Sequence, residues 1–256
     1  MIAAILYLLA IAIAELVTVY VQPVWGIGCH GAILLVVIVH STVIGRHFHR
    51  RLILSLALVP LIRIISLTMP LANIPQIWWY TIIYLPLLAA SIVMMRLLNY
   101  RSDQVGLTFK LFPVQLVVAL TGVVFGVAEY FILRPEAVVP ELTWQVAWLP
   151  ALMFLLCTGF VEEFIFRGVL QRSAMEVFGG WGIIYISLLF TTLHMGFLSW
   201  IDVAFVFIVA LFFGWVVKKT GSLLGVTLSH GITNIVLYLV APFFVNLIPP
   251  QFLPSL

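Results

Sequence analysis

The sequence has few charged residues and almost no cysteine. Only 8% of its 256 residues are Asp, Glu, Lys or Arg, whereas 64% are hydrophobic. A soluble domain carries about a quarter charged residues, so this composition excludes a soluble globular protein. The two cysteines, Cys29 and Cys157, provide neither a disulfide framework nor the ligand spacing of a cysteine metal site. The composition therefore indicates an integral membrane protein.

Apolar segments recur along the whole chain, with short polar breaks between them. A membrane-spanning helix takes about 20 apolar residues, and the breaks predict nine spans. The seventh and eighth are separated only by Ser199–Asp202, so that one of them has room to be tilted or partly re-entrant. We expect an all-α fold, a polytopic transmembrane helical bundle of eight or nine spans. The expected spans are roughly 2–22, 27–45, 52–70, 77–95, 114–133, 146–172, 181–198, 201–217 and 222–247.

Basic residues lie almost all on one side of this expected bundle. Nine follow the even-numbered spans, and only Arg134 lies in the opposite loops. Because cytoplasmic loops carry an excess of Lys and Arg, we expect these loops and the N-terminus to be cytoplasmic, at the cell (inner) membrane if the source is prokaryotic. The cations are too dispersed to indicate a nucleic-acid partner. The nine are Arg46, Arg50, Arg51, Arg96, Arg101, Lys110, Arg172, Lys218 and Lys219.

Three polar motifs interrupt the apolar segments of the last hundred residues. A charged side chain at bilayer depth is costly, so a pair of carboxylates in an apolar helix indicates a functional site by default. Residues four apart lie on one face of a helix, so we expect Glu163 and Arg167 to form an ion pair and Glu162 to face another partner. The motifs are Glu162-Glu163-x-x-x-Arg167, Phe190-x-x-x-His194 and His230-x-x-x-Asn234.

The spacing of the motifs from the nearest turns predicts that they meet. Glu162 and His194 lie 17 and 14 residues from the turn at Gly179-Gly180, which corresponds to about 20–25 Å at the helical rise of about 1.5 Å per residue. The third motif begins 9 residues beyond Gly221, or roughly 14 Å into the bundle. We therefore expect the three motifs to share one layer inside a C-terminal core of four helices.

A glutamate, two histidines and an asparagine in one layer suit the attack of water on an amide carbonyl. A carboxylate screened from bulk water has a raised proton affinity, which suits a general base. Histidine and asparagine can donate hydrogen bonds to the developing oxyanion. Histidine and glutamate are also ordinary ligands of catalytic zinc. The residues by themselves leave a metal-free site and a zinc site open.

The sequence lacks the catalytic motifs of the other classes of intramembrane protease. The sequence contains no His-Glu-x-x-His and no Gly-x-Ser-x-Gly, and its only aspartates, Asp103 and Asp202, lie in or beside loops. These absences exclude site-2-type metalloproteases, rhomboid-type serine proteases and aspartate-dyad proteases. The alternative to an enzyme is a proton-coupled transporter or a peptide-binding membrane scaffold. A transporter usually has an internal repeat, and we find none.

In these three motifs the chain resembles the CPBP family of intramembrane proteases, which includes type II CAAX prenyl endopeptidases and bacteriocin-processing and abortive-infection relatives. The resemblance covers about residues 100–247. It implies a CPBP-like catalytic core in residues 99–256, preceded by transmembrane helices of unassigned role in residues 1–98. It also implies an intramembrane endopeptidase whose substrate is a peptide or protein with a hydrophobic or lipidated tail, met within the membrane lipid.

The family also implies a role for each residue of the motifs. Glu162 would activate the water, His194 would help to position it, and His230 and Asn234 would stabilise the oxyanion. We favour a metal-free mechanism without a cofactor, because Asn234 is a poor zinc ligand but a good oxyanion donor. In the alternative, zinc is held by Glu162, His194 and His230. The supporting residues are Glu163, Arg167 and Phe190.

Overall fold

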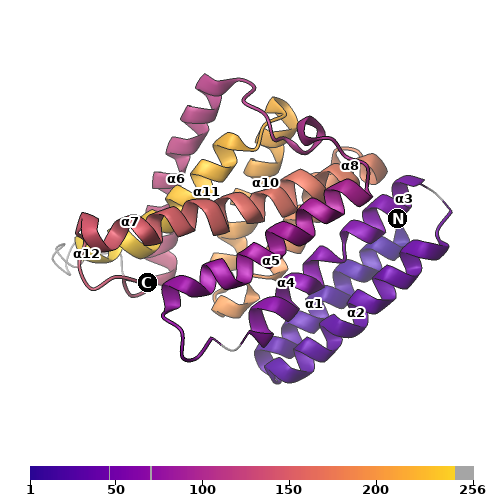
Figure 1. Cartoon of the computed structure of the whole chain (residues 1–256), viewed down its shortest axis with the longest axis horizontal. Helices are drawn as coiled ribbons and strands as arrows, with labels where there is room; N and C mark the ends of the chain where they lie inside the picture. Colours follow the sequence, from indigo (N-terminus) through magenta and orange to yellow (C-terminus); the bar gives the residue numbers. More distant parts are fainter. Residues whose placement is uncertain (46, 70, 246–256) are drawn as a thin grey trace.

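The computed structural model of the chain describes residues 1–45, 47–69 and 71–245, and none of these residues forms a strand. Eight of the described helical segments are long and apolar enough to cross a membrane. This confirms the expected all-α, polytopic helical bundle. In chain order the elements are α1 (Ile2–Tyr20), α2 (Pro23–Val43), α3 (His47–Ser55), α4 (Leu58–Thr68), α5 (Gln76–Leu97), η1 (Ser102–Val105), α6 (Phe112–Leu133), α7 (Trp144–Met153), η2 (Phe154–Glu162), η3 (Phe164–Leu170), α8 (Gln171–Phe178), α9 (Trp181–Thr192), η4 (Met195–Phe197), α10 (Trp200–Thr220), α11 (Leu224–Ile235), η5 (Val236–Val240) and α12 (Ala241–Val245) (Figure 1).

The seventh expected span is shorter than a membrane crossing. Apolar helical structure there is confined to Trp181–Phe197, in which α9 provides 12 residues and η4 three. The break expected before the eighth span is present, because the Ser199 hydroxyl accepts a hydrogen bond from the backbone N–H of Asp202 and begins α10. Within the described residues, the bundle therefore has eight helices long enough to span a membrane and one shorter apolar helix.

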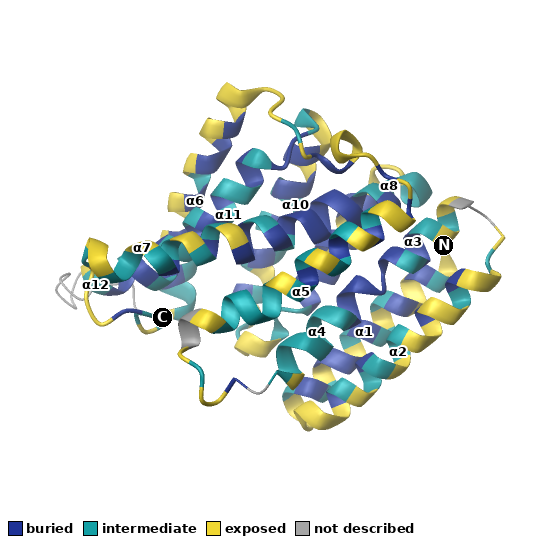
Figure 2. Ribbon diagram, in the orientation of Figure 1, coloured by how far each residue is buried: buried dark blue, intermediate teal, exposed yellow. Residues whose placement is uncertain are grey.

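One continuous helix of 35 residues, Trp144–Phe178, runs through the middle of the molecule (Figure 1). It comprises α7, η2, η3 and α8, and η2 and η3 are π-helical. Every residue of η3 is buried, so the centre of this helix lies in the core (Figure 2). The helix continues six residues past the expected end at 172 and stops at Gly179, whose positive φ of 58° suits glycine.

Close approach of backbones holds α11 between α6 and η2. A Cβ atom on Gly126 of α6 would lie 2.6 Å from the carbonyl oxygen of Thr233, and one on Gly159 of η2 would lie 2.7 Å from that of Thr227. Only glycine permits such contact, and small residues commonly bring membrane helices together in this way. The two contacts fix α11, and with it the His230 motif, opposite the paired glutamates.

The N-terminal helices are joined to the core by a buried group of charges. Glu15 of α1 is fully buried and accepts a hydrogen bond from Arg63 Nε of α4 at 2.6 Å, while His30 Nε2 of α2 lies 3.1 Å away. The second arm of the Arg63 guanidinium donates to the carbonyl oxygen of Leu193 at the end of α9. Arg63 thereby ties the N-terminal helices to the residue that precedes His194.

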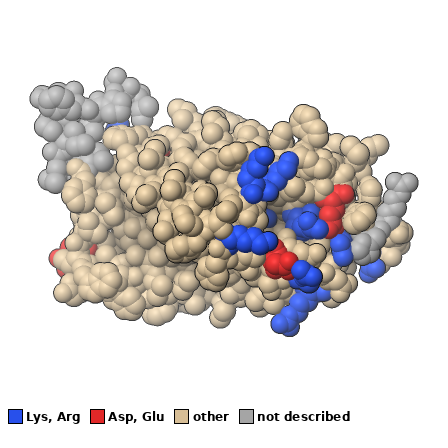
Figure 3. All heavy atoms as spheres, turned by 90° about the horizontal axis from the view of Figure 1, so that it is seen from above, with Lys and Arg blue, Asp and Glu red and all other residues tan. Residues whose placement is uncertain are grey.

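Charged side chains gather toward one end of the molecule, where α3 and α8 lie (Figure 3). Glu176 of α8 pairs there with Arg51 of α3 at 3.2 Å and with Arg172 at 3.4 Å. This is the end that the basic loops predict to be cytoplasmic. The orientation itself stays a prediction.

Candidate active site

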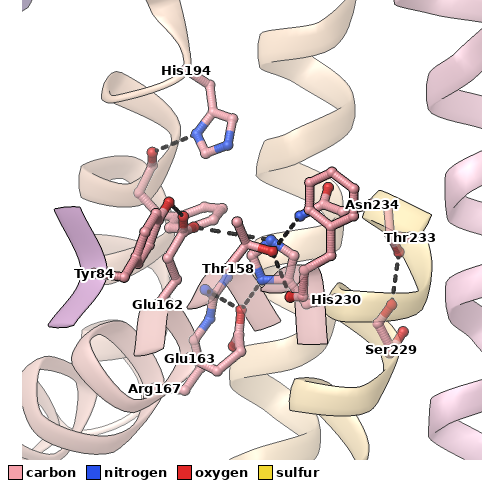
Figure 4. Close-up of polar contacts among 12 residues, drawn as sticks. Tyr84, Thr158, Glu162, Glu163, Arg167, His194, Ser229, His230, Thr233 and Asn234 are labelled. Atoms are coloured by element: carbon pink, nitrogen blue, oxygen red, sulfur yellow. Dashed lines mark hydrogen bonds and ion pairs between the residues drawn. The ribbon is translucent and has the colours of Figure 1, made fainter. Parts of the chain in front are cut away.

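Side chains from all three motifs line one cavity of about 360 Å³. The cavity lies between the long central helix, α9, α10 and α11, and α4, α5 and α6 also contribute to its walls. The sequence predicted that the motifs would share a layer, and in the structure their side chains meet around this space (Figure 4). The motif residues in its lining are Glu162, Glu163, Arg167, Phe190, His194, His230 and Asn234.

Glu163 is at the centre of a buried charge network. Its side chain is fully buried, that of Arg167 is 1% exposed, and Arg167 Nη1 donates to Glu163 Oε1 at 3.0 Å. His230 Nδ1 lies 2.8 Å from the same oxygen. The guanidinium of Arg167 also lies 4.3 Å from the ring centroid of Phe190, a cation–π contact. The expected ion pair is therefore present, and it also orients His230.

Glu162 faces the cavity instead. Its side chain is 19% exposed, and the Tyr84 hydroxyl of α5 donates a hydrogen bond to its Oε1 (Figure 4). Its other oxygen, Oε2, lies 3.9 Å from Nε2 of His230, which is too far for a direct hydrogen bond. The two adjacent glutamates thus differ: Glu163 is fully buried and pairs through Oε1 with Arg167 and His230, whereas Glu162 presents one oxygen to the cavity.

The local helix geometry helps to separate the two glutamates. Glu163 is the junction at which one π-helical segment ends and the next begins. π-Helical turns are rare and frequently occur at functional sites. Residue spacing alone did not predict the π-helical segments, because that spacing was interpreted with the geometry of an α-helix.

His194 and Asn234 are each held by one hydrogen bond. His194 Nδ1 lies 3.1 Å from the carbonyl oxygen of Phe190, so Nδ1–H donates and Nε2 keeps its lone pair. The Asn234 amide donates to the hydroxyl of Thr158 at 2.8 Å. This hydroxyl in turn donates to the carbonyl oxygen of Phe154. Asn234 retains a second amide N–H for another acceptor.

The residues do not assemble into a zinc site as they are placed. No three His, Cys, Asp or Glu side chains in the described part of the chain come close enough to hold a metal ion. The alternative ligand set of Glu162, His194 and His230 shares the cavity without forming such a group. Each histidine uses Nδ1 in a contact with Phe190 or with Glu163, which leaves Nε2 as the ring nitrogen open to another partner.

Several polar residues outside the motifs also line the cavity, among them Arg63, Tyr84, Glu129 and Thr158. Tyr84 and Thr158 carry no pattern that distinguishes them from packing residues in an apolar segment, whereas Arg63 is a charged residue inside the expected span 52–70. Glu129 also carries a signal, because it is an acid inside the expected span 114–133. Two of the four, Arg63 and Tyr84, come from the first 98 residues, so the cavity draws on both parts of the chain.

The fold and the cavity define a polytopic helical membrane protein with a buried carboxylate centre. Residues 143–236, which contain all three motifs, match the family model described as type II CAAX prenyl endopeptidase Rce1-like. The match supports the CPBP membership that the motifs indicated. Neither the curated proteins nor the solved structures include a significant match. The family implies a membrane protease with a peptide or protein substrate.

Proposed function

We propose that the chain is an intramembrane endopeptidase in which Glu162 activates the water that attacks a peptide bond. One observation carries this proposal. Inside the cavity, Glu162 Oε2 and His230 Nε2 face each other across 3.9 Å. A gap of this size between two polar atoms can be bridged by a single water through hydrogen bonds to both. The spacing of Glu162 and His230 therefore suits a bridging water molecule better than a direct hydrogen bond between the two side chains.

In the proposed reaction, Glu162 Oε2 takes a proton from the water while the water oxygen attacks the substrate carbonyl carbon. Tyr84 holds the other carboxylate oxygen, which keeps Oε2 directed at the water. The lone pair on His194 Nε2 can accept the second water O–H and so orient the attack. The proton held by Glu162 then passes to the amide nitrogen as the C–N bond breaks.

The oxyanion of the tetrahedral intermediate needs hydrogen-bond donors. Asn234 supplies the amide N–H that Thr158 does not use. His230 donates through Nε2–H when both ring nitrogens are protonated, with Nδ1–H directed at Glu163. Donors fixed before the reaction stabilise developing charge most effectively, because they need not reorganise. Here Glu163 and Thr158 provide that fixation.

We propose a substrate whose tail is hydrophobic or lipidated and which enters from the bilayer. The largely aromatic and aliphatic cavity wall supports such a tail, because apolar walls bind apolar groups. We also propose that the basic end of the molecule, near α3 and α8, faces the cytoplasm.

The proposal is tested by comparing cells that express the wild type or Glu162→Gln. New protein N-termini in the membrane fraction are labelled chemically and identified by mass spectrometry. Glutamine keeps the size of the side chain but cannot accept the proton, so the new N-termini should appear only with the wild type. Glu136→Gln, at an exposed loop carboxylate, is the matched control and should cleave normally.

The cleavage rates of the purified wild type and Glu162→Gln proteins are then compared. A folded Glu162→Gln sample that cleaves the identified substrate as fast as the wild type would overturn the assignment. Substrate binding or vesicle uptake without any cleavage by the wild type would instead indicate the scaffold or the transporter.

A further inference from the structure

Glu129 of α6 lines the same cavity as Glu162, His194 and His230, but from a helix outside the matched residues 143–236. It lies four residues before the end of α6 at Leu133, or about 6 Å at 1.5 Å per residue. A carboxylate at such depth is costly unless it has a partner. The chemical role of Glu129 therefore depends on what partners it has.

Within the described part of the chain, no side chain or backbone group forms a hydrogen bond or ion pair with the Glu129 carboxylate. The other two carboxylates of the cavity are occupied: Glu162 accepts from Tyr84, and Glu163 accepts from Arg167. Among the cavity-lining carboxylates of the described residues, Glu129 is thus the one without a partner.

The cations of the cavity are already used. Arg63 pairs with Glu15 at 2.6 Å, and Arg167 pairs with Glu163 at 3.0 Å. Asp202 at the start of α10 and His230 of α11 are both within electrostatic range of Glu129. Asp202 is fully buried, and neither of its carboxylate oxygens has a hydrogen-bond partner. No lysine or arginine in the described cavity lining is therefore left to pair with Glu129, and His230 directs its Nδ1 at Glu163.

Aromatic rings line the same cavity as Glu129. Phe205, Phe213 and Tyr238 belong to the cavity wall near α6 and α11. Phe125 of α6 packs edge-to-face on Phe205, with ring centroids 6.3 Å apart, which joins the helices that carry Glu129 and Asp202. The faces of aromatic rings attract cations. An unpartnered carboxylate within an aromatic wall is a suitable environment for an ammonium or guanidinium group.

We propose that Glu129 anchors a cation-binding subsite, which takes a lysine or arginine side chain of the substrate close to the hydrolysed bond. The inference rests on the proposed function, because it names a class of peptide for that active site. A long basic side chain suits the site, since its methylene groups contact the apolar wall while its charged end reaches the carboxylate. The substrate would then supply the partner that Glu129 lacks.

The first experiment measures charge preference. Leucine-rich pentapeptides carry one lysine at each position in turn, and matched peptides carry acetyl-lysine, which has the same backbone and no charge. We expect the wild type to cleave the best lysine peptide with a kcat/KM roughly 10- to 100-fold above its acetylated match, as for a hydrogen bond to a charged group. In Glu129→Gln this ratio should fall to about one.

Two variants control for indirect effects. Glu136→Gln removes an exposed carboxylate from the loop after α6 and should keep the preference for lysine. Glu129→Asp keeps the charge on a shorter side chain and should retain part of it. A wild-type ratio near one, or an unchanged ratio in a folded Glu129→Gln sample, would overturn the subsite.

The second experiment does not require cleavage. Fluorescent versions of the same two peptides are titrated onto Glu162→Gln and onto Glu162→Gln combined with Glu129→Gln, and binding is followed by anisotropy. Tighter binding of the lysine peptide that disappears in the double variant supports the subsite even if no peptide is hydrolysed. Equal binding of both peptides by both variants contradicts it. Hydrolysis without charge preference leaves the endopeptidase standing and removes the subsite alone.

Discussion

Tyr84, on α5, donates a hydrogen bond to Glu162 from 78 positions earlier in the chain. This contact joins the N-terminal helices, which the motifs did not include, to the proposed catalytic base. The opposite oxygen of Glu162 faces His230. A carboxylate held at one oxygen and open at the other is oriented for a single water. The first prediction tests whether this orientation matters for the rate.

Tyr84→Phe removes only the hydroxyl. We expect kcat to fall roughly 10- to 100-fold, because one hydrogen bond to a charged group is lost, while KM changes little and the protein stays folded. The control is Tyr185→Phe, which removes a buried hydroxyl that donates to the carbonyl of Ala4 at 2.8 Å, away from the cavity. If both variants lose the same small amount of activity, Tyr84 serves packing alone.

The pair of Glu163 and Arg167 predicts a distinct loss of stability. Both side chains are buried, so Arg167→Ala would leave the carboxylate unpaired except for His230. We expect the free energy of unfolding to fall by about 3–5 kcal/mol. Combining Glu163→Gln with Arg167→Met should recover most of it, because no buried charge is left. Unfolding by heat or denaturant in detergent measures the stability of both variants. Arg167→Ala as stable as the wild type would contradict the charge network.

Arg63 should affect both stability and activity, for separable reasons. Arg63→Met removes the main partner of the buried Glu15 and the donor to Leu193, next to His194. We expect a loss of about 3 kcal/mol in stability. Adding Glu15→Gln should restore stability but not the cleavage rate, because the carbonyl of Leu193 still lacks its donor. Full recovery of cleavage in the double variant would show that Arg63 does not position His194.

Tyr100, in the segment after α5, makes stability depend on alkaline pH. Burial, together with the charge of Glu176, raises the pKa of Tyr100 to about 12, although the hydrogen bond with Ser173 acts in the opposite direction. The ordinary value is about 10. Between these values the folded protein keeps a proton that the unfolded chain loses, so stability should fall as the pH rises from about 10 to 12.

This pH dependence is measured from unfolding midpoints across that range. Tyr100→Phe should flatten the decline, whereas Tyr20→Phe, at an exposed tyrosine, should not change it. An unchanged slope in Tyr100→Phe would assign the decline to other groups.

Removal of metal should not affect cleavage. The side chains of Glu162, His194 and His230 do not form a ligand group as they are placed. We expect the rate to be the same after treatment with EDTA or 1,10-phenanthroline. Elemental analysis of protein purified without a polyhistidine tag checks the same point, and stoichiometric zinc together with loss of activity on chelation would overturn the metal-free mechanism.

Much of the fold could be predicted from the chain, because a bilayer imposes a simple rule. Long apolar runs must become helices, so composition and the spacing of polar breaks predicted the bundle. The same rule made the charges of the Glu162-Glu163 motif conspicuous, and helical spacing predicted the pairing of Glu163 with Arg167. The length of the central helix, its π-helical segments and the short α9 were not predictable, because packing against neighbours decides them.

The candidate site, like the fold, was predicted only in part from the sequence. The sequence by itself determined the three motifs, their order and their approximate depth, since charged residues at bilayer depth and helical rise are local properties. Only the tertiary structure decided which side chains from distant helices reach them. Tyr84 bears no signal in an apolar segment, the contact of Arg63 with Leu193 cannot be found from either segment alone, and Glu129 gains significance only when its missing partner is seen. Hydrogen bonding between helices depends on how their faces meet, which no single segment encodes.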